Sequence, residues 1–356
     1  MAPDIEAVRR PAPHVHRRPG LPAAVRVYEV GPRDGLQAEA TVVPTPAKAE
    51  FCRRLVAAGV SALELTSFVS PRWIPQLSDA EQLLALLDLP GDIRRVVLAP
   101  NRRGLDRALA AGATELAVFV SATETFAEKN LHTTVDGALE SARPVVHGAA
   151  AQGLATRGYI SMCFGDPWEG AVETSAVADI AERLLDMGVA SISLGDTIGV
   201  ATPGHVLDLL EALSDRGIRP EITATHFHDT YGQALANVYA ALSAGITEFD
   251  SAAGGLGRCP YAAGATGNLA TEDLVWMLHG LGITTGIDLD ALIATSRWMS
   301  TVIGRPSPSR VVRALTASTS SPARPLDADG VTHAHPTPAD RGSDTGRPAH
   351  RRAGPR

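Results

Sequence analysis

The middle of the chain alternates short apolar runs with longer segments rich in alanine and leucine. The apolar runs predict strands at 25–30, 61–66, 95–99, 115–121, 155–162, 190–195, 222–228 and 246–250. The longer segments predict helices at 46–58, 104–111, 176–187 and 232–244. A glycine follows each of these helices, and glycine readily adopts the left-handed conformation that ends a helix. The chain therefore repeats a helix–glycine–strand unit.

This repeat predicts an α/β fold, because helices that alternate with strands connect parallel strands. Eight strands over residues 25–315 favour a closed (β/α)8 TIM barrel, followed by extra C-terminal helices that include 269–281. An open doubly wound sheet is the alternative, but no glycine-rich dinucleotide fingerprint follows the first strand. Residues 1–24 and 316–356 are expected to be disordered, since their polar, Pro-rich composition buries little apolar surface.

Composition narrows the possible partners. The formal net charge of −7 does not favour nucleic acid, and no apolar run approaches the roughly 18 residues of a membrane span. Three cysteines without a CxxC pair indicate a reducing, cytoplasmic environment. Only two of the 32 basic residues are lysines, Lys48 on the first helix and Lys129 in a segment expected to be a loop.

Polar residues gather where the predicted strands end, which is the end that carries the chemistry of a TIM barrel. Arg33, Asp34 and Gln37 follow the first strand, Glu64 and Ser67 lie in and after the second, Asp196 follows the sixth, and His226 and His228 close the seventh. A random surface distribution would not favour one end of each strand. The candidate active site is therefore this end of the barrel.

The most specific of these features is T-H-F-H-D at 225–229. Side chains alternate along a strand, so His226 and His228 share a face and are expected to bind a divalent metal ion. The alternative is a pair of core histidines. Asp34 is the natural oxygen ligand from across the barrel. Because neither lysine falls in a strand, a metal is a better electron sink than a Schiff base.

Arg33 and Glu64 are expected to act beside this metal. Arg33 could stabilise an oxyanion, or it could form an ordinary surface ion pair. Glu64 lies in an apolar strand, where a carboxylate needs a partner, and Arg33 is the most plausible one. Gly35 is expected to allow the tight turn that aims Arg33 and Asp34.

Cys259 lies in a glycine-rich loop, G-G-L-G-R-C-P-Y, that could close over a substrate. The neighbouring Arg258 would favour its thiolate, so we expect a catalytic cysteine in preference to a buried one. Cys52 and Cys163 are instead expected to be packed in the core.

Five motifs in order resemble the 3-hydroxy-3-methylglutaryl-CoA (HMG-CoA) lyase family. They are E-V-G-P-R-D-G-L-Q (29–37), E-L-T-S-F-V-S-P-R-W-I-P-Q (64–76), S-L-G-D-T-I-G (193–199), H-F-H-D-T-Y-G-Q-A-L-A-N (226–237) and G-R-C-P-Y-A-A-G-A-T-G-N-L-A-T-E-D (257–273). The resemblance extends from about residue 25 to about residue 315.

The resemblance implies a set of roles. It implies Mg²⁺ or Mn²⁺ bound by Asp34, His226, His228 and Asn268. It implies that Arg33 stabilises an enolate oxygen and that Cys259 transfers a proton. It also implies that Glu64 and Asp196 order the site, and that Gln37, Ser67 and Ser193 lie near the substrate or the metal.

The implied reaction is cleavage of HMG-CoA to acetoacetate and acetyl-CoA, by an enzyme that pairs as a homodimer. Arg258 departs from the family pattern and could favour a related thioester such as citramalyl-CoA. The sequence also allows a synthase that condenses an acyl-CoA with a 2-oxo acid, and a non-catalytic CoA-binding relative. The site residues that the resemblance identifies argue against the non-catalytic relative.

Overall fold

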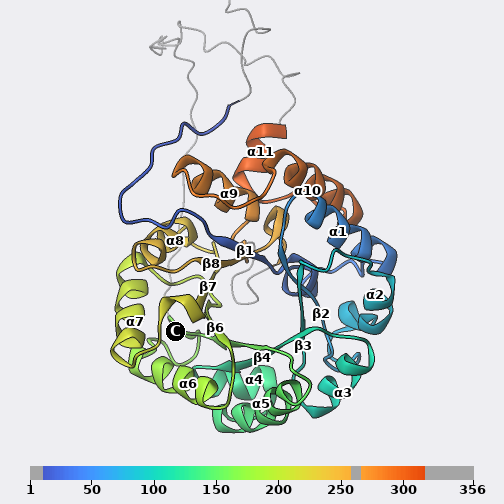
Figure 1. The fold of residues 1–356 in the computed structure, drawn as a ribbon, viewed down its shortest axis with the longest axis vertical. Coiled ribbons are helices and arrows are strands. Elements are labelled where there is room, and N and C mark those ends of the chain that lie inside the picture. Colours follow the sequence, from blue (N-terminus) through green and yellow to red (C-terminus); the bar gives the residue numbers. More distant parts are fainter. Residues whose placement is uncertain (1–10, 258–265, 317–356) are drawn as a thin grey trace, which may run out of the picture. The chain divides into compact units, whose positions relative to one another are not determined.

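The computed structural model describes residues 11–257 and 266–316 of the 356-residue chain. Its strands form a closed parallel barrel in the order β1 to β8, with helices around the outside (Figure 1). The strands are β1 (Arg26–Glu29), β2 (Ala62–Ser67), β3 (Arg94–Leu98), β4 (Glu115–Ser121), β5 (Thr156–Ser161), β6 (Ser191–Asp196), β7 (Thr223–Phe227) and β8 (Glu248–Ser251). The predicted TIM barrel is confirmed, and the predicted strand ends lie within two residues of these bounds.

The helices follow the same scheme. They are α1 (Thr45–Ala57), α2 (Ala80–Leu86), α3 (Arg102–Ala110), α4 (Glu124–Leu131), α5 (Val135–Ala150), α6 (Thr174–Asp186), α7 (Pro203–Asp215) and α8 (Ala234–Ser243). The predicted extra helices after the barrel are α9 (Thr271–Gly280), α10 (Leu289–Ile303) and α11 (Arg310–Thr316). Lys129 lies in α4 and not in a loop, so that expectation is wrong.

Glycines end several helices as predicted. Gly188 follows α6 with a φ of 105°, a backbone conformation that side chains disfavour. Gly59 follows α1 with a φ of 95°, and a Cβ there would lie 2.1 Å from the carbonyl oxygen of Gly286. A glycine is therefore needed at position 59 for two reasons. Its backbone conformation disfavours a side chain, and the segment before α10 leaves no space for one.

The inside of the barrel contains charged residues. Arg157, Glu64 and Asp250 have fully buried side chains, on β5, β2 and β8. A buried charge is tolerated only when it is paired and hydrogen-bonded, and Arg157 contacts carboxylates of both Glu248 and Asp250. The barrel therefore contains an ion-pair network in addition to apolar packing.

The segments at the two ends of the barrel domain pack against it. α10 contacts α1, α9 and α11. The N–H of His16 donates to the carbonyl of Gly280 at 2.8 Å, and Val15 and Arg17 lie against Gly282. These contacts give residues 15–17 fixed neighbours, so the disorder expected for 1–24 does not hold for this part. Residues 1–10 and the 317–356 part of the predicted tail lie outside the described residues.

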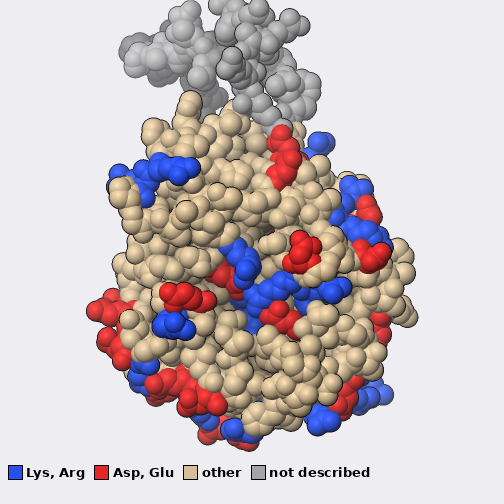
Figure 2. Space-filling view, in the orientation of Figure 1, with Lys and Arg blue, Asp and Glu red and all other residues tan. Residues whose placement is uncertain are grey.

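The surface carries charges of both signs. In the view of Figure 2, Lys and Arg side chains gather near the middle of the drawn face, with Asp and Glu side chains beside them. No helix among the described residues is long and apolar enough to cross a membrane.

Candidate active site

Asp34, His226 and His228 come together at the end of the barrel where the strands finish. Their candidate ligand atoms all lie within 4.8 Å of one another, and the two imidazole rings have centroids 5.3 Å apart. His226 is the fourth residue of β7, and His228 follows the strand directly. Phe227, between them, is buried and packs near Phe164, as the alternation of side chains along a strand predicts.

Asn268 reaches this cluster because the backbone of residues 267–269 pairs with the end of β7. The N–H of Leu269 donates to Phe227, the N–H of Asp229 donates to Gly267, and His228 pairs with Asn268 in an antiparallel bridge. The Asn268 Nδ2 then donates to Asp34 Oδ2 at 2.8 Å and to the Leu256 carbonyl at 3.1 Å. The structure therefore brings together all four residues of the predicted metal set.

These four residues fit a divalent cation. The Asn268 Oδ1 and the His228 Nδ1 are buried and have no hydrogen-bond partner among the described residues. Buried polar atoms are rarely left unpaired, and two nitrogen with two oxygen donors suit a divalent first-row metal. Burial, together with the nearby His226, lowers the pKa of His228 to about 3, so His228 is neutral and available as a ligand.

The turn after β1 places Arg33 and Asp34. It is a single π-helical turn, Gly31–Gly35, and such turns often occur at functional sites. Gly35 is needed here for space, because a Cβ would lie 2.7 Å from the Leu256 Cβ. The tight turn expected at Gly35 is present and its φ is not positive, so the space beside Leu256 is what requires a glycine here.

Arg33 is held by two carboxylates. Its Nε donates to Glu64 Oε2 at 2.7 Å and one terminal nitrogen donates to Asp34 Oδ1 at 3.0 Å, so Glu64 has the partner predicted for it. Burial opposes ionisation of Asp34, but Arg33 and the two histidines outweigh it and lower the Asp34 pKa to about 2. Tyr159 lies beneath the guanidinium, 5.7 Å from ring centroid to Cζ. Arg33 is thus a fixed cation beside the metal set.

A cavity of about 1920 Å³ opens over these residues. Of the predicted site residues, Arg33, Asp34, Gln37, Ser67, His226 and His228 line it. The cavity is also lined by four cations, Arg72, Arg103, Arg107 and Lys129. A wall with several cations suits an anionic ligand, and the volume exceeds the roughly 300–1,000 Å³ of ordinary small-molecule sites.

Two more of the predicted site residues lie behind the cavity wall. The Ser193 hydroxyl donates to Asp250 Oδ2 at 2.9 Å, so its predicted place near the substrate stays a prediction. Asp196 accepts from the backbone N–H groups of Val200 and Ala201 and thereby holds the loop after β6. Burial, partly offset by those hydrogen bonds, raises the Asp196 pKa to about 7.

The structure describes two of the three cysteines. Cys259 and the neighbouring Arg258 lie outside the described residues, so the catalytic role predicted for Cys259 stays a prediction. Cys52 and Cys163 are fully buried as expected. Burial raises the thiol pKa of Cys52 to about 12 and that of Cys163 well above its usual range, so both are unreactive core residues.

Three residues close to the site were not predicted from the sequence. Asp250 lies below His226, Tyr159 lies below Arg33, and His132 lines the cavity with its ring against Trp73. A signal existed for the first two, because E-F-D and R-G-Y place polar residues on one face of a strand. His132 offers no such signal, since it follows a helix.

Comparisons with known proteins match most of the chain. The HMGL-like family model matches residues 24–299. A mitochondrial hydroxymethylglutaryl-CoA lyase from Arabidopsis thaliana is 48% identical over 83% of this chain and 63% of its own length, so the chain spans less than two thirds of that relative.

Solved structures show the same relationship. A hydroxymethylglutaryl-CoA lyase from Pseudomonas aeruginosa is 44% identical, with a TM-score of 0.81 over 83% of this chain and 98% of its own. An HMG-CoA lyase from Acinetobacter baumannii, in complex with coenzyme A and 3-methylmalate, is 37% identical, with a TM-score of 0.79 over 89% of this chain and 100% of its own. The resemblance seen in the motifs is confirmed, and this chain belongs to the HMGL-like family.

Proposed function

We propose that this protein is a metal-dependent lyase that cleaves HMG-CoA to acetoacetate and acetyl-CoA. The observation that carries the proposal is the joining of Asp34, His226, His228 and Asn268 into one donor set beside Arg33. The first three of these residues line a wide cavity. The names of the similar lyases support the same substrate. The metal that we propose is Mg²⁺ or Mn²⁺.

The donor set would hold the metal through two imidazole nitrogens, the Asp34 carboxylate and the Asn268 amide oxygen. Such a cation polarises a hydroxyl or carbonyl oxygen and lowers the pKa of the hydroxyl. Asp34 is ionised at every physiological pH, because its pKa is about 2. It can therefore bind the metal as an anion, and Asp34 or a histidine-linked water is our candidate for the group that accepts the proton of the substrate's tertiary hydroxyl.

Arg33 would stabilise the charge that develops when the carbon–carbon bond breaks. Loss of the hydroxyl proton forms the new ketone of acetoacetate, and the bonding electrons move onto the thioester as an enolate. Glu64 and Asp34 fix the guanidinium in advance, so little reorganisation is needed. A proton added to the enolate carbon completes acetyl-CoA, and Cys259 is our candidate donor.

The cavity wall would bind the coenzyme A part of the thioester. Arg72 and Arg103 line the cavity, and no ion pair joins either of them to another residue in the described ranges. A coenzyme A carries several phosphate charges, which guanidinium groups bind well. The Acinetobacter relative was solved with coenzyme A, which supports this assignment.

Two broader expectations complete the proposal, a cytoplasmic location and a homodimer. Similar lyases are named as cytoplasmic or mitochondrial. The apolar residues Leu274, Val275 and Leu278 of α9 are buried within the chain, so that helix gives no support to a dimer. Light scattering of the purified protein tests the oligomeric state.

The direct test is an assay of acetoacetate formation from HMG-CoA, in buffer with EDTA and after addition of Mg²⁺ or Mn²⁺. We expect turnover only with the metal. Citramalyl-CoA is assayed in parallel, and turnover of that thioester alone would reassign the substrate. Condensation of acetyl-CoA with a 2-oxo acid, without cleavage of either thioester, would overturn the lyase proposal.

A further inference from the structure

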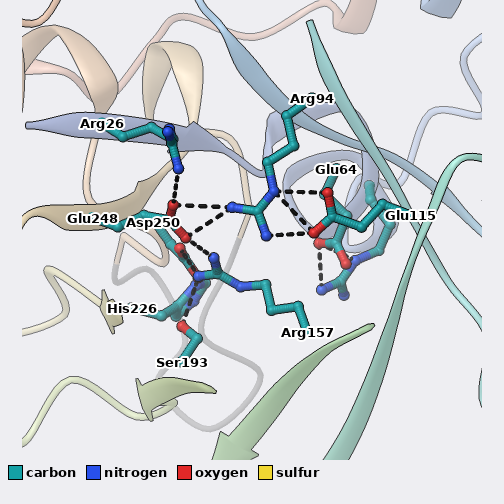
Figure 3. Close-up of polar contacts among 10 residues, drawn as sticks. Arg26, Glu64, Arg94, Glu115, Arg157, Ser193, His226, Glu248 and Asp250 are labelled. Carbon is teal, nitrogen blue, oxygen red and sulfur yellow. Dashed lines mark hydrogen bonds and ion pairs between the residues drawn. The ribbon is translucent and has the colours of Figure 1, made fainter. Parts of the chain in front are cut away.

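An ion-pair network in the barrel lies beside His226, one of the proposed metal ligands (Figure 3). Glu248 and Asp250 are two residues apart on β8, so both side chains point into the barrel. The fully buried Arg157, from β5, contacts both carboxylates. Arg94 and Arg26 also contact Glu248.

The two carboxylates of β8, Glu248 and Asp250, differ in the groups that they contact. An oxygen of Asp250, Oδ2, lies 3.4 Å from His226 Nδ1 and accepts a hydrogen bond from Ser193 at 2.9 Å. Both oxygens of Glu248 are instead turned to the arginines Arg26, Arg94 and Arg157. Asp250 is thus the member of the pair that faces a metal-binding side chain.

This contact favours one nitrogen of His226 as the metal ligand. The His226 Nδ1 is buried and forms no hydrogen bond among the described residues, and the Asp250 carboxylate faces it at 3.4 Å. A carboxylate accepts hydrogen bonds and cannot donate them, so its neighbour Nδ1 is favoured as the protonated nitrogen. The lone pair is then on Nε2. A neutral imidazole has two forms of similar energy, and a fixed carboxylate selects one of them. Metal-binding histidines in many proteins depend on a partner of this kind, and its loss typically weakens metal binding by about 10–100-fold.

Asp250 is itself fixed in place. Its side chain is fully buried, with Arg157 on one oxygen and Ser193 on the other. A buried carboxylate needs a cation as a partner, and the Arg157 guanidinium supplies it to Asp250. The aromatic ring of Tyr28 stacks on the same guanidinium, 4.1 Å from ring centroid to Cζ, and limits its movement.

We propose that Asp250 is a positioning residue, which holds His226 with Nδ1 protonated and Nε2 directed to the metal, and that Arg157 and Ser193 hold Asp250. This inference rests on the metal dependence in the proposed function. It assigns a role to a buried polar group that the steps of the reaction do not use.

Mn²⁺ binding tests the proposal without reference to turnover. The purified full-length protein is titrated with Mn²⁺, and free Mn²⁺ is followed by electron paramagnetic resonance. Asp250→Asn keeps the shape of the side chain and removes its charge. We expect it to raise the dissociation constant for Mn²⁺ about 10–100-fold. At saturating Mn²⁺ its KM for HMG-CoA should stay within about threefold of the wild-type value, because Asp250 does not line the cavity.

Glu248→Gln is the matched control. It removes the same charge from the same strand and also disturbs Arg157, but it leaves the contact with His226 in place. We expect Mn²⁺ affinity within about threefold of wild type. If both variants lose Mn²⁺ affinity equally, the network affects metal binding only through its total charge or through folding, and the proposal is overturned.

A second variant covers the case in which Asp250→Asn does not fold. Ser193→Ala removes one hydrogen bond from the Asp250 oxygen near His226 and changes no charge. We expect weaker Mn²⁺ binding by about threefold to tenfold, since one neutral hydrogen bond contributes roughly 0.5–1.5 kcal/mol. In ¹⁵N-histidine spectra, the signal that disappears in His226→Gln should show a protonated Nδ1 in the wild type.

Each outcome has a distinct meaning. If the wild type binds Mn²⁺ and neither Asp250→Asn nor Ser193→Ala weakens it, the positioning role is overturned and the proposed function stands. If the spectra show His226 protonated on Nε2, the positioning role is also overturned. If the wild type binds no Mn²⁺, the metal dependence in the proposed function fails, and this inference fails with it.

Discussion

Arg33 shows how a single residue is prepared for catalysis. Glu64 and Asp34 accept hydrogen bonds from its guanidinium, and the Arg33 side chain still lines the cavity. A lysine has one nitrogen, which cannot reach both carboxylates and a ligand in the same geometry. We predict that Arg33→Lys lowers kcat for HMG-CoA cleavage by about 10²–10³-fold, the loss expected when one preorganised donor to a developing charge is removed.

The control for this prediction is Arg102→Lys, which makes the same exchange in an exposed i,i+4 ion pair on α3. It should leave kcat within about twofold. Steady-state kinetics of both variants at saturating metal provide the measurement. If Arg33→Lys keeps more than a third of the wild-type kcat, the guanidinium does not stabilise the transition state.

Single residues also show how far the sequence could predict the site. His226, His228 and Asp34 followed from their places at strand ends, and Glu64 followed from the cost of an unpaired buried carboxylate. Asn268 could not be found from spacing, because it reaches the site through backbone pairing of 267–269 with the end of β7. Asp250 lies beside His226 because the stagger of β8 against β7 pairs these two positions, and no local sequence pattern encodes that stagger.

At the scale of elements, Glu29 joins two loops of the active site to the barrel. It ends β1, and its carboxylate accepts from the N–H of Gly31 in the turn before Arg33 and from the N–H of Ala253 after β8. Thr271 of α9 donates to its second oxygen. One buried carboxylate therefore connects β1, β8 and α9 beneath the candidate site.

The ionisation of Glu29 predicts a dependence of stability on pH. Burial, partly offset by the three hydrogen bonds, raises its pKa to about 7 in the folded protein. The folded state therefore holds this proton more tightly than the unfolded state, where the pKa is about 4.3. The stability from this group is complete below that value and is lost as the pH rises through about 7.

Glu29→Gln should remove this contribution, since glutamine still accepts from both N–H groups and does not ionise. Urea unfolding at pH 5 and pH 8 measures the effect. We predict that the loss of stability between these values is smaller in Glu29→Gln than in wild type, by on the order of 1–3 kcal/mol. The exposed Glu211→Gln on α7 is the control and should keep the wild-type difference. An unchanged difference in Glu29→Gln would refute the assignment.

The loops of the cavity wall carry a further prediction. Arg72 follows β2 and Arg103 lies in α3, and both line the cavity. The Arg72→Gln and Arg103→Gln variants should each raise KM for HMG-CoA by about 5–20-fold and leave kcat within about twofold, because the phosphate contacts are the same in substrate and transition state. The exposed Arg53→Gln on α1 should change neither constant. A fall in kcat with unchanged KM would contradict binding of the coenzyme by this wall.

Elements were the part of the fold that sequence predicted best. The strands of a parallel barrel are buried on both faces and read as apolar runs, and glycines mark the helix ends. The need for a glycine at position 35 could not be predicted from its own turn, since it comes from Leu256, more than 200 positions later in the chain. Close approaches between distant segments leave no periodic signal. The same reason hid the contacts of residues 15–17 with the end of α9.

At the scale of the whole molecule, the metal should couple the active site to the stability of the barrel. The proposed ligands come from the turn after β1, from β7 and its end, and from the segment before α9, so a bound ion would join parts of the chain far apart in sequence. A ligand that binds only the folded state stabilises it, by about 2.7 kcal/mol at 100 times its dissociation constant.

We predict that saturating Mn²⁺ raises the melting temperature of the wild-type protein by about 5–10 °C, since 1 kcal/mol corresponds to roughly 2–4 °C in a large domain. EDTA should reverse the shift. His226→Gln should lose it, whereas His279→Gln, a histidine of α9 outside the cluster, should keep it. Thermal unfolding followed by circular dichroism gives the measurement. An equal shift in His226→Gln would place the Mn²⁺ somewhere other than the end of β7, because removal of one of four ligands should greatly weaken binding.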